Sequence, residues 1–342
     1  MRTLDEKTAA RRLQEPELRA RVGEILNRHP AVGLAVGVVR GGSMEAFSGH
    51  GVANITSCTP VTEDTVFRIG SITKTFTAIA VMQLWERGLV DLVAPANAYL
   101  RAFELVPARP GFRPTTVRQL LTHTGGVPEQ AHPTQVFRTD YGESVPLGRP
   151  APTLAEYYRG GLRVAVEPGT SFIYGDHSFA ALGQIVEDVA GTPLHRYLRD
   201  HIFEPLGMAD TSLLRPEGVR ANLATGYELT RRGPRAVVDL ELIPKAAGAI
   251  YSTTRDMARY VAALLGGGAN RHGSVLEPAT LSTMFEPHYR PDPRLPGMGL
   301  GFMRANLGGH QTVEHQGIVP GFNSQLWVAP NDGVGIVAFT NG

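Results

Sequence analysis

The chain has 342 residues, of which 42% are hydrophobic and 19% charged, and its formal net charge is +1. This composition is typical of a folded globular protein and excludes a disordered chain or a coiled coil. The basic residues are scattered, and no apolar run reaches the roughly 18 residues of a membrane span, so neither nucleic acid nor a membrane is an expected partner.

The single cysteine, Cys58, excludes an internal disulfide and a cysteine-based metal cluster. We expect Cys58 to be a small buried residue. The N-terminal residues are charged and lack the apolar segment of a secretion signal, which predicts a cytoplasmic protein.

Hydrophobic spacing predicts the elements in chain order. A helix is expected near the N-terminus, followed by a hairpin whose two strands flank Gly41-Gly42-Ser43. Helices then dominate the middle of the chain, and strands return at its end. The expected helices are 17–27, 72–89, 117–121, 177–190, 193–203 and 254–265, and the expected strands are 32–40, 44–47, 311–315, 324–329 and 334–340. Residues 125–152 and 227–244 are expected to be loops that determine the substrate.

Ser71-Ile72-Thr73-Lys74 is the first candidate for catalysis, because it opens the long apolar helix. Residues three apart are neighbours on one helix face, so a lysine held there can share a proton with the serine hydroxyl. A serine at a helix start beside a solvated lysine would fit the same residues.

Two further segments carry candidate site residues. Tyr174 and Asp176 lie at a turn before a predicted helix, and a tyrosine close to a cationic lysine is a plausible general base. His315 precedes Gly317 in a strand-like segment. A glycine there lets a substrate lie against the strand, and the next N–H, that of Ile318, can help to bind an oxyanion. Taken singly, these residues are better explained as a core tyrosine and a structural histidine.

Six segments follow one another along the chain: 67–74 around Ser71 and Lys74, 120–126 around His123, 168–174 ending in Tyr174, 202–208, 248–253, and 315–317. In this order they resemble the serine β-lactamase-related family, which includes class C β-lactamases, low-molecular-mass penicillin-binding proteins, D-aminopeptidases and esterases. The resemblance spans almost the whole chain, from about Pro30 to Asn341. It implies one β-lactamase-like catalytic domain of the α/β (α+β) class, in which an antiparallel sheet from both chain ends is flanked by helices. The expected parts are a sheet-containing region, 15–75 and 245–342, and a mainly helical inserted region, 76–244.

The resemblance also implies roles. Ser71 would be the acylated nucleophile, Lys74 would assist its deprotonation, and Tyr174 would be the base. The N–H groups of Ser71 and Ile318 would form the oxyanion hole, and His315 would line the substrate side of its strand. The family needs no metal or organic cofactor, and its partner here would be a small ester, amide or peptide.

Two departures from the family pattern shape the function that we expect. Asp176 stands where the family often has asparagine, and its charge would favour the charged form of Lys74. His315-Gln316-Gly317 stands where β-lactamases have Lys-Thr-Gly, so the lysine that helps to hold a β-lactam carboxylate is missing. We therefore expect a serine hydrolase acting on small esters, amides or D-amino-acid peptides, with Asp176, His315, Gly317 and Ile318 contacting the substrate.

Other functions stay open at this stage. A weak β-lactamase or penicillin-binding protein would keep the same nucleophile, and a non-catalytic scaffold would keep only the fold. Metal-dependent hydrolysis has little support, because no pair of the 11 histidines has ligand-like helical spacing. The sequence does not predict an oligomeric state.

Overall fold

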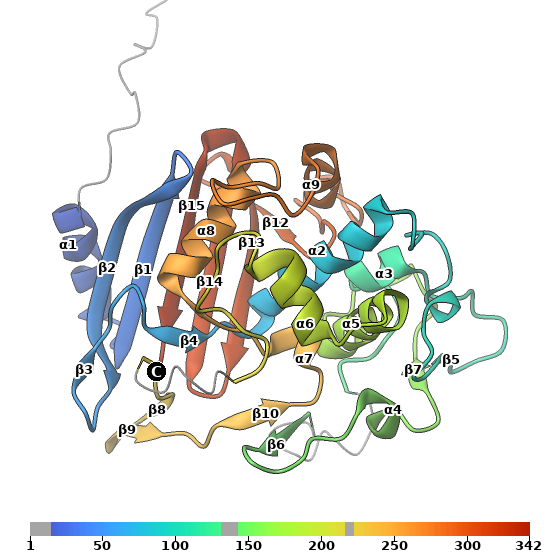
Figure 1. Ribbon diagram of the computed structural model, residues 1–342, viewed down its shortest axis with the longest axis horizontal. Coiled ribbons are helices and arrows are strands. Elements are labelled where there is room, and N and C mark those ends of the chain that lie inside the picture. The colour runs from blue at the N-terminus through green and yellow to red at the C-terminus, as the bar shows by residue number, and fades with distance from the viewer. Residues whose placement is uncertain (1–14, 131–142, 216–221) are drawn as a thin grey trace, which may run out of the picture.

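A central antiparallel sheet organises the computed structural model, which describes residues 15–130, 143–215 and 222–342 (Figure 1). Within these residues the sheet has seven strands in the order β12-β13-β14-β15-β1-β2-β3. The first and last parts of the chain meet in it, because β1 pairs with β15 along its length. This confirms the expected antiparallel sheet built from both chain ends. The strands are β1 (Gly33–Arg40), β2 (Ser43–Asn54), β3 (Thr59–Pro60), β12 (Met303–Leu307), β13 (His310–Val319), β14 (Phe322–Ala329) and β15 (Val334–Thr340).

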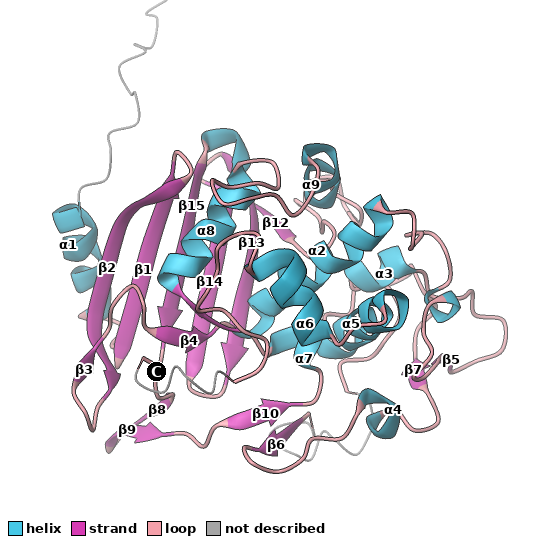
Figure 2. Ribbon diagram, in the orientation of Figure 1, coloured by secondary structure: helices cyan, strands magenta, loops and turns pink. Residues whose placement is uncertain are grey.

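Helices cover the two faces of the sheet near β1 and β2 (Figure 2). Neighbouring residues of a strand point to opposite faces. Ala35 and Val39 of β1 belong to the main core with helix α8 (Thr254–Leu265), whereas Val36 and Val38 pack with helix α1 (Glu15–Leu26). The apolar stripe on each helix is thus the cause of its docking, and both helices occur close to their predicted positions.

The remaining helices form a layer beside the sheet. This layer contains α2, which is buried along most of its length. Every residue of α2 from Thr73 to Leu84 is buried, which explains its apolar composition. The predicted helix 72–89 is shorter in the structure, because a 3₁₀ turn, η1 (Gly70–Ile72), precedes α2 and the helix ends at Glu86. The helices of this layer are α2 (Thr73–Glu86), α3 (Val117–Leu121), α4 (Leu154–Tyr157), α5 (Asp176–Ala190), α6 (Leu194–Leu198), α7 (Lys245–Gly248) and α9 (Pro278–Phe285).

Short strand pairs replace much of the two predicted loops. Residues 144–146 of the first loop pair with residues 240–242 of the second, which places the two segments side by side. Residues 131–142 of the first loop lie outside the described part of the chain. The β6–β10 pair was not predicted because each strand is short and its partner is far away in sequence. The short strands are β4 (Val66–Arg68), β5 (Leu105–Pro107), β6 (Ser144–Pro146), β7 (Leu162–Val164), β8 (Tyr227–Thr230), β9 (Gly233–Ala236), β10 (Leu240–Leu242) and β11 (Tyr251–Thr253).

The expectation of a buried cysteine is wrong. Cys58 is exposed in the turn between β2 and β3, where its backbone has a φ of 52° and its thiol approaches the Ile55 carbonyl at 3.5 Å. A tight left-handed turn at the sheet edge directs this small side chain outward, and sequence periodicity does not reveal such a turn.

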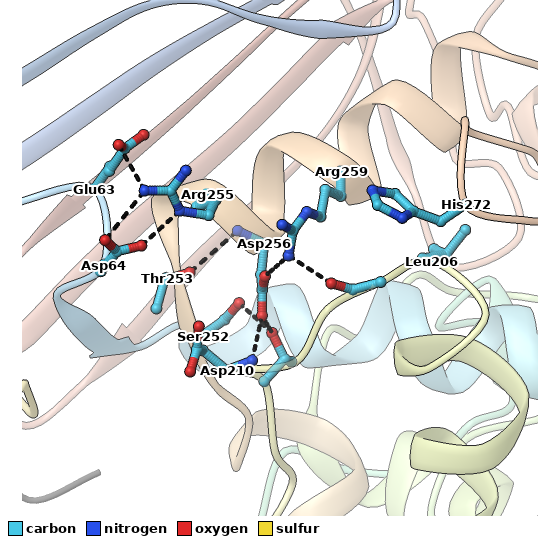
Figure 3. Close-up of polar contacts among 12 residues, drawn as sticks. Glu63, Asp64, Leu206, Asp210, Ser252, Thr253, Arg255, Asp256, Arg259 and His272 are labelled. Atoms are coloured by element: carbon cyan, nitrogen blue, oxygen red, sulfur yellow. Dashed lines mark hydrogen bonds and ion pairs between the residues drawn. The ribbon is translucent and has the colours of Figure 1, made fainter.

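A buried carboxylate fixes the start of α8 (Figure 3). Asp256 is fully buried and accepts hydrogen bonds from the backbone N–H of Asp210, the Thr211 hydroxyl and the Arg259 guanidinium. Next to it, Arg255 reaches the carboxylates of the turn before β4, Glu63 and Asp64. Buried charges persist only where they are paired and hydrogen-bonded. This cluster therefore locks α8 to the turn before β4 and to Asp210 and Thr211.

Among the described residues, no helix is both long and apolar enough to cross a lipid bilayer.

Aromatic packing behind the site generates the first prediction. Phe76 of α2 is fully buried, stacks on Tyr260 of α8 with ring centroids 4.0 Å apart, and meets Phe203 edge-on at 5.6 Å. Phe76→Ala should lower the free energy of unfolding by about 3–5 kcal/mol, because it leaves a large cavity in the core. Leu307→Ala, at a position that is 60% exposed, is the control and should cost less than about 1 kcal/mol. An equal decrease in the free energy of unfolding of the two variants, measured by urea denaturation, would contradict this account of the core.

Candidate active site

Ser71 lies in a constrained turn between β4 and α2. Gly70 precedes it with a φ of 51°, a conformation that favours glycine. A Cβ built on Gly70 would lie 2.8 Å from the backbone nitrogen of Ile318, so only glycine allows β13 to come this close. The turn therefore holds Ser71 against the part of β13 that was expected to contribute to the oxyanion hole.

Lys74 lies one turn after Ser71 on the same helix face and is fully buried. Its Nζ donates hydrogen bonds to Ser71 Oγ at 2.8 Å, to Asp176 Oδ1 at 2.6 Å and to the carbonyl oxygen of Ala247 at 3.0 Å. An ammonium group has three protons, so these three acceptors satisfy it completely. The structure thus brings Lys74 together with Ser71 and Asp176, as the sequence predicted, and adds the Ala247 carbonyl of α7 as a third partner.

The electrostatic balance at Lys74 favours its charged form. Burial alone would lower the pKa of Lys74, but the attraction of Asp176 and of Tyr174 outweighs burial and raises the pKa above its ordinary value. Lys74 is therefore an ammonium ion throughout the neutral pH range. A lysine in this state donates a hydrogen bond to Ser71 and cannot accept the serine proton until it has lost its own.

Tyr174 lies over the Lys74 ammonium, with the ring centroid 5.0 Å from Nζ. Its ring also packs against the buried imidazole of His123 at 4.5 Å. Burial, followed by the charge of Lys74, lowers the pKa of His123 well below its ordinary value, so this imidazole is neutral at neutral pH. His123 thus supports the tyrosine without adding a second positive charge.

His315 is placed differently from the expectation. Its side chain is fully buried, its ring centroid lies 6.2 Å from that of Tyr174, and it is not among the described residues that line the cavity beside Ser71. Burial and the charge of Lys74 lower the pKa of His315 to about 3, so the imidazole is neutral. Because Nδ1 lies 2.7 Å from the carbonyl oxygen of Gln316, Nδ1 carries the proton. The unprotonated Nε2 has no hydrogen-bond partner among the described residues.

Gly317 and Ile318 occupy an edge of β13. The neighbouring strand β12 pairs only as far as Glu314, which leaves the end of β13 open on the side of η1. A Cβ on Gly317 would lie 2.1 Å from the carbonyl oxygen of Ile69, so a larger residue would push the strand away from the serine. The Ile318 side chain is 68% exposed and lines the cavity.

A cavity of about 830 Å³ opens beside Ser71. Its walls come from β6, β8, β10, the start of α5 and the turn between β13 and β14. Three of its described lining residues are carboxylates and most of the others are apolar; they include Ser71, Glu143, Asp176, Glu228, Leu229, Val237, Leu240, Leu242, Ile318 and Phe322. The volume suits a small organic substrate.

Sequence reasoning missed two contributors to the site. The Ala247 carbonyl acts through its backbone, so no side-chain pattern reports it. Glu143 lies in a segment that was expected to be a loop, and it reaches the cavity through the pairing of β6 with β10. His123 was part of a quoted motif, but its contact with Tyr174 could be found only in three dimensions.

Comparison with known proteins decides the family. The model of the β-lactamase family matches residues 18–342. The chain belongs to the β-lactamase family. This confirms the resemblance that the sequence motifs predicted.

Individual members of the β-lactamase family are similar along much of the chain. A β-lactamase of Yersinia enterocolitica is 29% identical over 70% of this chain and 56% of its own length, so the chain spans little more than half of that relative. Penicillin-binding protein 4 of Amycolatopsis lactamdurans is 28% identical over 94% of this chain and 84% of its own. The octameric penicillin-binding protein homologue from Pyrococcus abyssi superposes with a TM-score of 0.80 at 26% identity, covering 96% of this chain and 74% of that one. These names agree with the expected class, a serine hydrolase.

The charge balance at Lys74 generates the second prediction. Burial lowers the pKa of Lys74, and the charge of Asp176 is the strongest attraction that offsets this effect. Asp176→Asn removes that charge, so the pKa of Lys74 should fall below its wild-type value. The side-chain ¹⁵N resonances of a lysine-labelled sample can show this directly, because the only lysines are Lys7, Lys74 and Lys245.

The matched control for this titration is Glu241→Gln, which removes the partner of Lys245 at 2.8 Å. It should change the Lys245 resonance and leave that of Lys74 as in the wild type. An unchanged Lys74 titration in Asp176→Asn would show that Asp176 does not maintain the charge.

Proposed function

We propose that the protein is a serine hydrolase that forms an acyl-enzyme on Ser71 and acts on small esters, amides or D-amino-acid peptides. The observation that supports this most strongly is the 2.8 Å hydrogen bond from Lys74 to the Ser71 hydroxyl beside a cavity of about 830 Å³. A serine hydroxyl is a weak nucleophile, and it needs a neighbouring group that takes its proton.

In the proposed reaction, Tyr174 acts as its phenolate and takes the proton of Ser71 while Ser71 Oγ attacks the substrate carbonyl. The carbonyl π electrons move to oxygen, and the N–H groups of Ser71 and Ile318 bind the resulting oxyanion. When the carbonyl re-forms, the leaving group departs with the proton held by Tyr174. A water molecule then attacks the acyl-enzyme by the same steps and releases the acid and Ser71.

Lys74 supports this sequence as a fixed positive charge. Its ammonium stabilises negative charge on the serine and tyrosine oxygens, and its hydrogen bond orients Ser71 Oγ. The Asp176 partner is the reason that Tyr174, and not Lys74, is proposed as the base.

Esters and amides fit the cavity better than β-lactams do. The lining residues that the structure describes include no lysine or arginine, whereas the carboxylate of a β-lactam requires a cation. Weak β-lactamase activity is therefore the second candidate, and a penicillin adduct on Ser71 would favour it. The cytoplasmic location expected from the sequence stays a prediction.

The third prediction tests the nucleophile. A fluorophosphonate should add one phosphonyl group to Ser71, as intact mass and peptide mapping would report. Ser71→Ala should lose the adduct and reduce the hydrolysis of p-nitrophenyl butyrate at least about thousandfold, because the covalent step disappears.

Ser144→Ala is the matched control, since Ser144 lies in the wall of the same cavity, whereas Ser71 is the serine bonded to Lys74. It should keep both the adduct and most of the activity. Hydrolysis that survives in Ser71→Ala would refute the proposed nucleophile.

A further inference from the structure

One carboxylate in the cavity has no part in the proposed reaction. Glu143 lies directly before β6 and lines the same cavity as Ser71. Its Oε1 is 3.2 Å from Nε2 of His177, a fully buried residue of α5. On the other side of that imidazole, Nδ1 is 2.7 Å from the hydroxyl of the buried Tyr158. A chain of polar groups thus runs from the protein interior to the cavity wall.

Tyr158 and His177 lie behind the Glu143 carboxylate. Burial raises the pKa of Tyr158 well above its ordinary value, so the phenol beside Nδ1 of His177 keeps its proton. Nε2 of His177 lies within ion-pair distance of Glu143 Oε1, although the two atoms are not aligned as a hydrogen bond. Burial raises the pKa of Glu143 above its ordinary value, as expected for a carboxylate without a lysine or arginine partner among the described residues.

The other carboxylates of the cavity differ in this respect. Asp176 is paired with Lys74 at 2.6 Å, and Glu228 is paired with Arg235 in the β8–β9 hairpin. Within residues 15–130, 143–215 and 222–342, the partner found for Glu143 is His177, and no lysine, arginine or histidine lines the cavity. Glu143 is therefore the one described cavity carboxylate without a permanently charged partner.

We infer that Glu143 binds a protonated amine of the substrate, which makes it a specificity-determining residue of this site. The inference rests on the proposed hydrolase function, because the cavity beside the nucleophile is what indicates a ligand here. An apolar wall excludes water around the ion pair and strengthens it, and the position of Glu143 is set in advance by His177. The preferred substrates are accordingly aminoacyl esters or amides, or esters with an amine in the leaving group.

Isosteric substrate pairs test this inference. They also show whether the amine belongs to the acyl half or to the leaving group of the substrate. For the acyl half, D- and L-alanine p-nitrophenyl esters are compared with p-nitrophenyl isobutyrate, in which a methyl group replaces the ammonium. For the leaving group, 3-(aminomethyl)phenyl acetate is compared with 3-ethylphenyl acetate. The readout is the ratio of kcat/KM for the ammonium ester to that for its neutral isostere, divided by the same ratio for uncatalysed hydrolysis, because an ammonium group next to the carbonyl itself activates an ester.

In the wild-type protein this ratio should be at least about ten for one of the two substrate pairs, as expected for a charge-assisted hydrogen bond. Glu143→Gln should bring that ratio to about one. Glutamine has the same shape and keeps an oxygen atom beside Nε2 of His177, so the variant should melt at the wild-type temperature. Glu228→Gln removes an equal charge from the same cavity but from a paired residue, and it should keep the ratio.

Three outcomes would overturn the inference. The first is a ratio near one for both substrate pairs, while the neutral esters are still hydrolysed and Ser71 is still labelled. This result overturns the role of Glu143 and leaves the hydrolase proposal unaffected. A high ratio that Glu143→Gln does not change assigns the amine to another group. Loss of all hydrolysis together with no fluorophosphonate label on Ser71 overturns the proposed function and this inference with it.

Discussion

A single buried ammonium ion determines how the site is assembled. Lys74 lies on a helix that is buried along most of its length, and an unpaired charge there would cost several kcal/mol. Its three protons are satisfied by Ser71, by Asp176 at the start of α5, and by the carbonyl of Ala247 in α7. The charge therefore fixes three segments relative to one another. The geometry around the nucleophile follows from this requirement.

The same requirement separates the roles of the neighbouring groups. Because Asp176 and Tyr174 keep Lys74 charged, the lysine is an electrostatic element and the tyrosine is left as the proposed base. The two imidazoles nearest to this charge, His123 and His315, are both neutral, since burial and the ammonium lower their pKa values. One positive charge thus lies at the centre of the site, and the Glu143 carboxylate, which has no lysine or arginine partner among the described residues, lies at the cavity wall.

Local patterns in the sequence predicted local features of the structure well. The helices at 117–121 and 254–265 and the strand at 334–340 have the expected bounds, because burial on one face imposes a period that the sequence displays. The pairing of β6 with β10 was missed, since it joins short segments almost a hundred residues apart. The contacts of Lys74 with Ser71 and Asp176 followed from the motifs. The chain from Tyr158 through His177 to Glu143 was not predictable, because its members come from three segments with no shared pattern.

The central claim is that Ser71 reacts within a preformed oxyanion hole beside a charged Lys74. A crystal structure of the phosphonylated protein would test it most directly. We expect the phosphorus bonded to Ser71 Oγ, one phosphoryl oxygen within hydrogen-bond distance of the N–H groups of Ser71 and Ile318, and Lys74 still bonded to Asp176. Phosphorus on another residue, or a phosphoryl oxygen pointing away from both N–H groups, would contradict the account.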